Sequence, residues 1–251
     1  MPKSRDELTA EEIAALPEGH PWKTDGIFSY GGTPFTPSDD ADVEKFEAEQ
    51  AALADRQRKA KLEEHYRNSS GVPERYWEES LDTYDVSSGF AEQLAAVKKF
   101  VRSETKGGVL ILCGDSGTGK THLGCGAIRE IGGMYVTMQR LLFLVDSTMS
   151  YRAKETKMDV LERLCRTAGV LVLDEIGRGI REDAMKELAG YLIGERYAGL
   201  RKVIIISNLA KPELVRWLGI AVSDRLNETC TFVEFSGQSY RIKKRRELGI
   251  A

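Results

Sequence analysis

The chain has 251 residues and a mass of 28.0 kDa, which suffices for one or two domains. Charged residues make up 30% and hydrophobic residues 41%, which excludes full disorder, and a net charge of −3 argues neither for nor against a polyanionic partner. No apolar run approaches the roughly 20 residues of a membrane span, and the N-terminal sequence MPKSRDELTAEE lacks the apolar core of a signal peptide, so we expect a cytoplasmic protein.

Charge and proline are unevenly distributed along the chain. Residues 1–75 contain 10 Lys and Arg against 16 Asp and Glu, a net charge of −6, whereas residues 76–251 carry a net charge of +3. Six of the seven prolines also precede residue 76. This shift in composition predicts an N-terminal region and linker over residues 1–75 and a second domain over residues 76–251.

The N-terminal region is predicted to be mainly helical. Thr9 has the spacing of a capping box and opens a short helix that Pro17 ends. Residues 18–38, rich in glycine and proline, are predicted to form a loop, and a longer helix follows over residues 41–67. The apolar residues of that helix are sparse, which leaves two interpretations open: a solvated helix, or a helix that docks on a partner protein.

The second region alternates helical patterns with short apolar runs. A helix over residues 89–104 precedes a first buried strand, and further helical stretches separate the other strands. The predicted strands cover residues 109–113, 134–137, 170–173, 203–206 and 231–235. This order favours a parallel sheet between two layers of helices, a three-layer α/β fold.

A phosphate-binding loop follows the first of these strands. The segment matches G-x-x-x-x-G-K-[ST] without departure and reads Gly114, Asp115, Ser116, Gly117, Thr118, Gly119, Lys120 and Thr121. Glycines let backbone N–H groups converge on an anion at the N-terminus of the following helix. Lys120 supplies a charge for the terminal phosphates of ATP, and the Thr121 hydroxyl is a candidate ligand of Mg²⁺.

Two further strands end in polar residues. Asp174 and Glu175 follow the apolar run at residues 170–173, and the carboxyl ends of parallel strands form the ligand-binding edge of such a sheet. We expect Asp174 to hold Mg²⁺ and Glu175 to polarise the attacking water. Asn208, after the next strand, is a candidate for orienting that water. Adjacent acids favour hydrolysis of ATP by water over a kinase reaction.

Together these motifs resemble the AAA+ ATPases of the initiator clade, and within them the DnaC-type helicase loaders and the IstB transposition helpers. The likeness covers about residues 64–245 and includes Ser223-Asp224-Arg225-Leu226 and Ser239-Tyr240-Arg241. It implies a P-loop, RecA-like sheet with Asn208 as sensor 1, Arg225 as the arginine finger that reaches ATP in a neighbouring subunit, and Arg241 as sensor 2. Tyr84 and His122 are placed at the nucleotide.

The resemblance also implies partners. Family members self-associate into a nucleotide-dependent spiral around single-stranded DNA, and their N-terminal region contacts a hexameric replicative helicase of the DnaB type. The corresponding extra helix covers about residues 139–166. The candidate DNA-binding residues are basic or aromatic, as sequence-independent binding requires: Tyr151, Arg152, Lys154, Arg178 and Arg181.

Three functions follow from this resemblance and from the motifs. The first is an ATP-dependent loader that deposits a replicative helicase on single-stranded DNA. The second is an IstB-like transposition helper that acts on duplex DNA. The third is a nucleotide-gated adaptor, in which bound ATP only orders the assembly and ATP hydrolysis is negligible. A small-molecule kinase is disfavoured because no acceptor pocket is evident.

Overall fold

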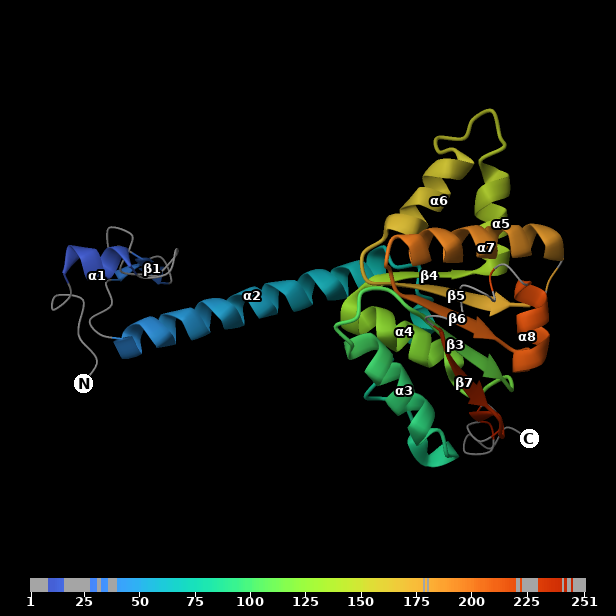
Figure 1. Ribbon diagram of the computed structural model, residues 1–251, viewed down its shortest axis with the longest axis horizontal. Coiled ribbons are helices and arrows are strands. Elements are labelled where there is room, and N and C mark those ends of the chain that lie inside the picture. Colours follow the sequence, from blue (N-terminus) through green and yellow to red (C-terminus); the bar gives the residue numbers. More distant parts are fainter. Residues whose placement is uncertain are drawn as a thin grey trace. The chain divides into compact units, whose positions relative to one another are not determined.

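The computed structural model describes residues 9–15, 28–30, 33–35, 40–177, 179, 181–219, 222, 230–240, 242 and 245. The chain forms two compact units, residues 1–61 and residues 62–251 (Figure 1). Within the described residues, no helix is both long and apolar enough to cross a bilayer.

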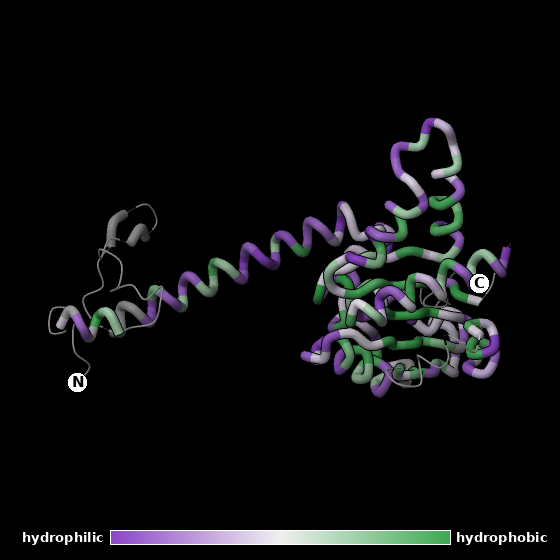
Figure 2. The backbone as a smooth tube through the Cα atoms, turned by 45° about the horizontal axis from the view of Figure 1, so that its top comes forward, coloured by the Kyte–Doolittle hydropathy of each residue, from purple (hydrophilic) through white to green (hydrophobic). Residues whose placement is uncertain are grey.

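The first unit contains short elements and most of one long helix. Helix α1 (Ala10–Ala14) and helix α2 (Asp40–Asn68) confirm the two predicted helices. Strands β1 (Phe28–Tyr30) and β2 (Thr33–Phe35) pair antiparallel, so the prediction of a loop over residues 18–38 was wrong there. Strands of three residues are too short to show an alternating pattern. Hydrophilic residues predominate along α2 (Figure 2).

The second unit is built on a parallel five-stranded sheet in the order β4-β5-β6-β3-β7. The strands confirm the five predicted apolar runs and are β3 (Val109–Gly114), β4 (Gly133–Thr137), β5 (Val170–Ile176), β6 (Val203–Ser207) and β7 (Cys230–Phe235). Strands β3, β5 and β6 are mostly apolar along their buried length because helices cover both faces, and the buried polar residues Asp174 and Ser207 lie toward the carboxyl ends of β5 and β6.

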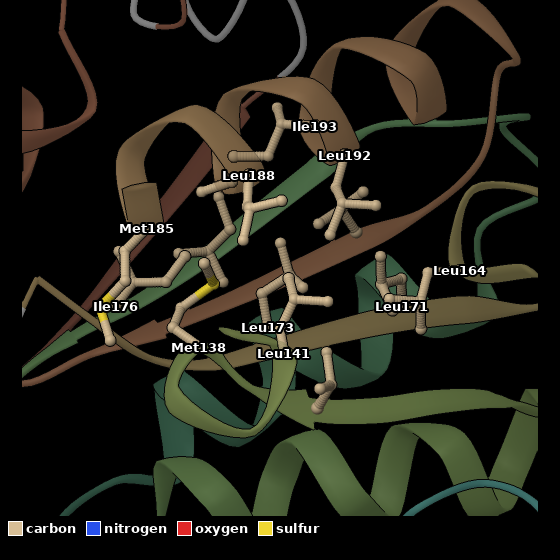
Figure 3. Packing of buried hydrophobic residues seen from close by; sticks show 14 of the residues in the cluster. Met138, Leu141, Leu164, Leu171, Leu173, Ile176, Met185, Leu188, Leu192 and Ile193 are labelled. Carbon is tan, nitrogen blue, oxygen red and sulfur yellow. The ribbon is translucent and has the colours of Figure 1, made fainter. Parts of the chain in front are cut away.

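Helices on the two faces complete the predicted three layers (Figure 1). One face packs against α3 (Ala91–Arg102) and α4 (Lys120–Ile131). The other packs against α5 (Met138–Ser147), α6 (Lys157–Arg166), α7 (Glu182–Ala198) and α8 (Lys211–Leu218), and α8 contacts both α7 and β3. Figure 3 shows Leu188 and Leu192 of α7 above Leu171 and Leu173 of β5, in the hydrophobic core of this second face.

The segment between α2 and α3 is bonded to the edge strand β4. Tyr135 donates its backbone N–H to Ser70 O over 2.7 Å, and His65 Nε2 lies 2.8 Å from Gly133 O. Gly71 has a φ of +77°, and a Cβ there would lie 2.6 Å from Tyr135 O, so only glycine fits. These contacts place residues 62–75 in the second unit, although composition predicted a boundary at residue 75.

Two helices occupy the region where one was expected, over residues 139–166. Helix α5 ends at Ser147, and Thr156 starts α6 with a capping box that includes Asp159. The intervening residues form an exposed loop, in which the Tyr151 side chain is fully exposed. The α5–α6 hairpin therefore presents its loop to solvent.

The far end of the sheet from the phosphate loop contains a fully buried arginine. Within the described part of the chain, Arg196 of α7 donates to backbone carbonyls, namely Leu164 O, Cys165 O, Thr167 O, Gly169 O and Lys202 O, at 2.8–3.2 Å. Burial lowers the pKa of this guanidinium to about 10. The side chain thus satisfies the carboxyl end of α6 and the residues that lead into β5 and β6.

Candidate nucleotide-binding site

The phosphate loop connects β3 to α4 with three glycines at positive φ. Gly119 has a φ of +89°, and a Cβ there would lie 2.6 Å from the ring of Tyr84. Tyr84 is buried behind the loop and donates its hydroxyl to Thr118 O over 2.7 Å. Tyr84 therefore supports the loop, and its place at the nucleotide stays a prediction.

Lys120 begins α4 and is held inside the loop. Its ammonium donates to Gly114 O over 2.9 Å and to Asp115 O over 2.6 Å, and the residue is only 4% exposed. The loop backbone thereby fixes a positive charge at the N-terminus of α4, where the helix dipole also favours an anion.

The side chain of Asp174 at the end of β5 meets Thr121 of α4. Thr121 donates its hydroxyl to Asp174 Oδ2 over 2.8 Å, and Tyr135 of β4 donates to the same oxygen over 3.0 Å. The Glu175 backbone N–H donates to Asp174 Oδ1 over 2.6 Å. Burial raises the pKa of the Asp174 carboxyl, whereas these hydrogen bonds and the charge of Lys120 oppose that rise.

Glu175 and Asn208 lie at the ends of adjacent strands, β5 and β6. Glu175 is exposed and has a φ of +60°, a conformation that costs about 1–3 kcal/mol in a residue other than glycine. The hydroxyl of Ser207 donates to Ile176 O over 2.6 Å and ties the two strand ends together. Backbone strain of this kind is concentrated at functional sites, so the strained conformation of Glu175 next to Asp174 is consistent with a role in the site.

These groups share one cleft of about 550 Å³. The volume is typical of a site for a ligand of nucleotide size. Its lining combines the loop, both strand ends and the segment after α2, namely Arg75, Tyr76, Glu79, Ser116, Gly117, Gly119, Lys120, Thr121, His122, Asp174, Glu175, Ile206, Asn208 and Tyr240.

A smaller pocket of about 100 Å³ adjoins this cleft and shares Glu79, Gly119, His122 and Tyr240 with it. Tyr84 and Phe90 contribute rings to it, and His122 packs edge-on against Tyr84 with ring centroids 5.3 Å apart. His122 Nε2 lies 2.8 Å from Ser80 O, which fixes the imidazole. An aromatic pocket next to a phosphate loop suits a nucleobase.

The donor set near Asp174 fits Mg²⁺ better than a metal with an all-protein shell. Among the described residues, no group of three His, Cys, Asp or Glu side chains is placed to hold a metal ion. Thr121 and Asp174 instead offer two hard oxygen ligands in contact with each other. Mg²⁺ usually takes one or two such protein ligands and completes its shell with phosphate oxygens and water.

A comparison of the sequence with protein-family models identifies the family of the chain. Residues 43–248 match the family model described as IstB-like ATP binding protein. The chain belongs to this IstB-like family. One relative is the ATP-binding protein of insertion sequence IS21 from Pseudomonas aeruginosa, 26% identical over 190 residues that make up 69% of this chain and 68% of the relative.

Solved structures of AAA+ initiators are structural neighbours of the IstB-like chain. The DnaC helicase loader is 27% identical, with a TM-score of 0.55 over 65% of this chain and 100% of that one. Two others share the fold: DnaI (21%, TM-score 0.51, 66% of this chain and 93% of that one) and DnaA from Aquifex aeolicus bound to AMPPCP (16%, TM-score 0.54, 72% and 57%). The predicted resemblance and the P-loop, RecA-like fold class are confirmed.

Three predicted site residues of the IstB-like chain, Arg178, Arg225 and Arg241, lie outside the described residues. The chain next to one of them is described: Tyr240 donates its backbone N–H to Gly117 O in the phosphate loop over 2.8 Å. The residue that precedes Arg241 therefore contacts the loop, whereas the roles of all three arginines remain predictions.

The predicted DNA-binding residues differ in their surroundings. Tyr151, Arg152 and Lys154 are exposed in the loop of the α5–α6 hairpin. Arg181 instead forms an ion pair with Asp146 of α5, with Nη1 2.5 Å from Oδ2. A neighbouring carboxylate offsets the charge of Arg181, so the hairpin loop is the better candidate surface for DNA.

Sequence reasoning missed residues that tertiary contacts bring to the site. Arg75, Tyr76 and Glu79 line the cleft although they follow no motif in the sequence. Tyr135 lies within an apolar run and resembles an ordinary core residue. The signal that was available for Tyr135 is its place on the strand next to Asp174, since a polar hydroxyl in that run needs a partner.

Replacing Tyr135 by phenylalanine is expected to raise the Mg²⁺ concentration that half-saturates ATP binding by about tenfold, since groups that orient metal ligands are worth 10–100-fold in affinity. Burial and Asp174 raise the pKa of Tyr135, so its hydroxyl remains a donor. A titration of Mg²⁺ against fluorescent ATP measures the effect. Tyr191→Phe, on α7, is the matched control, and an unchanged midpoint for Tyr135→Phe would contradict the role.

Proposed function

We propose that the chain is a Mg²⁺-dependent ATPase that loads a replicative helicase onto DNA. The observation that carries the ATPase assignment is the 2.8 Å contact between Thr121 and Asp174, in the cleft that Lys120 also lines. In the proposal Lys120 binds the terminal phosphates, and Thr121 and Asp174 hold Mg²⁺. Bound Mg²⁺ would neutralise charge on those phosphates.

In the proposed hydrolysis Glu175 accepts the proton of the attacking water and Asn208 orients that water. Their positions at adjacent strand ends support this assignment. Arg225 of a neighbouring copy and Arg241 of the same chain supply positive charge to the γ-phosphate. Because Arg225 acts in trans, the proposal requires self-association, and turnover per chain should rise with protein concentration.

Helicase loading is supported by two observations. The DnaC helicase loader is 27% identical and is covered over its full chain in that structure. Residues 1–75 carry a net charge of −6, which suits docking on a protein better than on DNA. In this proposal the N-terminal region contacts a DnaB-type helicase, and Tyr151, Arg152 and Lys154 contact single-stranded DNA.

A second candidate is a transposition helper that assembles on duplex DNA. The family model and the relative from Pseudomonas aeruginosa support it, because both carry the name of the insertion-sequence family. The candidates differ in the form of DNA that they bind and in their protein partner.

Binding to labelled single-stranded and duplex DNA, with and without ATP, separates the two candidates. The loader is expected to prefer single strands and, with ATP, to deposit the host's hexameric helicase on circular single-stranded DNA. The Lys120→Ala variant, measured at the same concentration as the wild type, is the control for ATP dependence. ATP-dependent binding to duplex DNA, without any complex with the helicase, would overturn the loader assignment and support the helper.

A further inference from the structure

We infer that Arg75 is a second phosphate-binding cation of the nucleotide site and that it contacts the terminal phosphate of ATP. The inference rests on the proposed ATPase function. It adds to the phosphate loop a group from the segment that precedes the predicted ATPase domain, and this segment is continuous with α2.

The position of Arg75 shows at which end of the candidate nucleotide site it lies. Arg75 lines the large cleft together with Lys120, Asp174 and Asn208. It does not line the smaller aromatic pocket around Tyr84, which suits the base. Because one end of the site contains the metal ligands and the other the rings, Arg75 faces the phosphate end.

The turn that presents Arg75 is held on three sides. Tyr66 of α2 donates its hydroxyl to Tyr76 O over 2.7 Å. Trp77 donates its indole N–H to Val72 O over 3.2 Å, and Arg129 of α4 donates to Trp77 O over 2.6 Å. The backbone around Arg75 is therefore fixed relative to α4, the helix that begins with Lys120.

The surroundings of Arg75 leave its guanidinium available to a ligand. Arg67 and Arg129, the neighbouring arginines, both pair with Glu63. Arg75 is exposed, and its described contact is with the ring of Tyr76, 4.8 Å from the guanidinium carbon. Stacking on a ring leaves the N–H groups in the guanidinium plane free to bind two phosphate oxygens.

The chemistry of the phosphate end shows what Arg75 adds. The ammonium of Lys120 already donates to two loop carbonyls, whereas a guanidinium offers five donors in a planar fork. A group that contacts the terminal phosphate strengthens ATP binding more than ADP binding. Arg75 therefore contributes to the choice between the two nucleotides.

The test measures affinities of the full chain for fluorescent ATP and ADP in Mg²⁺. Arg75→Ala is expected to weaken ATP binding by about tenfold or more, and ADP binding by less than threefold, since hydrogen bonds to charged groups are of this strength. Arg75→Lys, which keeps the charge but not the fork, should fall between. Glu74→Gln in the same turn and Arg166→Ala on α6 are the controls.

Each outcome decides the inference. Wild-type affinity of Arg75→Ala for ATP, or equal losses for ATP and ADP, would overturn the assignment while leaving the ATPase proposal intact. If Arg75→Ala melts at a lower temperature than the wild type, the ratio of ATP affinity to ADP affinity is measured on Arg75→Lys instead, and the same criterion applies to it. A wild-type chain that binds neither nucleotide would overturn both proposals.

Discussion

Glu175→Gln is expected to lower ATP turnover by about 10²–10⁴-fold while leaving ATP affinity within about twofold of wild type, since a general base contributes this much to rate. Glutamine keeps the size of the side chain but accepts no proton. The backbone N–H of residue 175 still donates to Asp174, so the proposed metal ligands keep their positions.

Phosphate release and fluorescent-ATP binding, measured on the same preparation, test this expectation. Asp183→Asn, an acid in the first turn of α7, is the matched control. Lys120→Ala should instead lose ATP binding itself. If Glu175→Gln hydrolyses ATP at the wild-type rate, the assignment of Glu175 as the base is wrong. If the variant has lost hydrolysis but still supports assembly and partner binding, ATP serves as a gate with negligible turnover.

Arg196→Met is expected to destabilise the second unit by about 3–5 kcal/mol. Removing one member of a buried, charged hydrogen-bond network has an effect of this size, because the remaining polar groups lose their partner. Methionine fills much of the volume but donates no hydrogen bond. The carbonyl oxygens of Leu164 and Gly169 would then lose the guanidinium as their donor, and Lys202 O would keep the backbone N–H of Leu171.

Urea unfolding followed by circular dichroism measures this loss. Arg166→Met, at a position where the side chain is 75% exposed, should change stability by less than about 0.5 kcal/mol. Arg196→Lys should recover part of the loss, because an ammonium has three donors where the guanidinium has five. An Arg196→Met protein as stable as wild type would show that water replaces the guanidinium.

Local sequence predicted the sheet because its central strands β3, β5 and β6 begin with continuous apolar runs that both layers of helices bury. It also predicted the residues at the strand ends, since Asp174 follows such a run directly and Asn208 follows one after Ser207. Contacts between distant segments were not predictable in this way. Tyr135 meets Asp174 across 39 positions and Arg196 meets Leu164 across 32, and neither pair has a local pattern.

The boundary predicted at residue 75 shows the same limit. Composition changes there, but hydrogen bonds from His65 and to Ser70 attach the preceding segment to β4. Arg75 and Tyr76 enter the nucleotide cleft for the same reason. Composition reports where polar and apolar residues change in frequency, whereas packing decides which segment completes a site.

The attachment of residues 65–71 to β4 has a consequence for how copies of the chain meet. An outermost strand with free N–H and C=O groups is a template for pairing with another molecule. Here Ser70 and His65 occupy such groups on Tyr135 and Gly133, and Gly71 lies against the carbonyl of Tyr135. Strand addition along this edge of the sheet is therefore blocked, and the proposed self-association would have to use other surfaces.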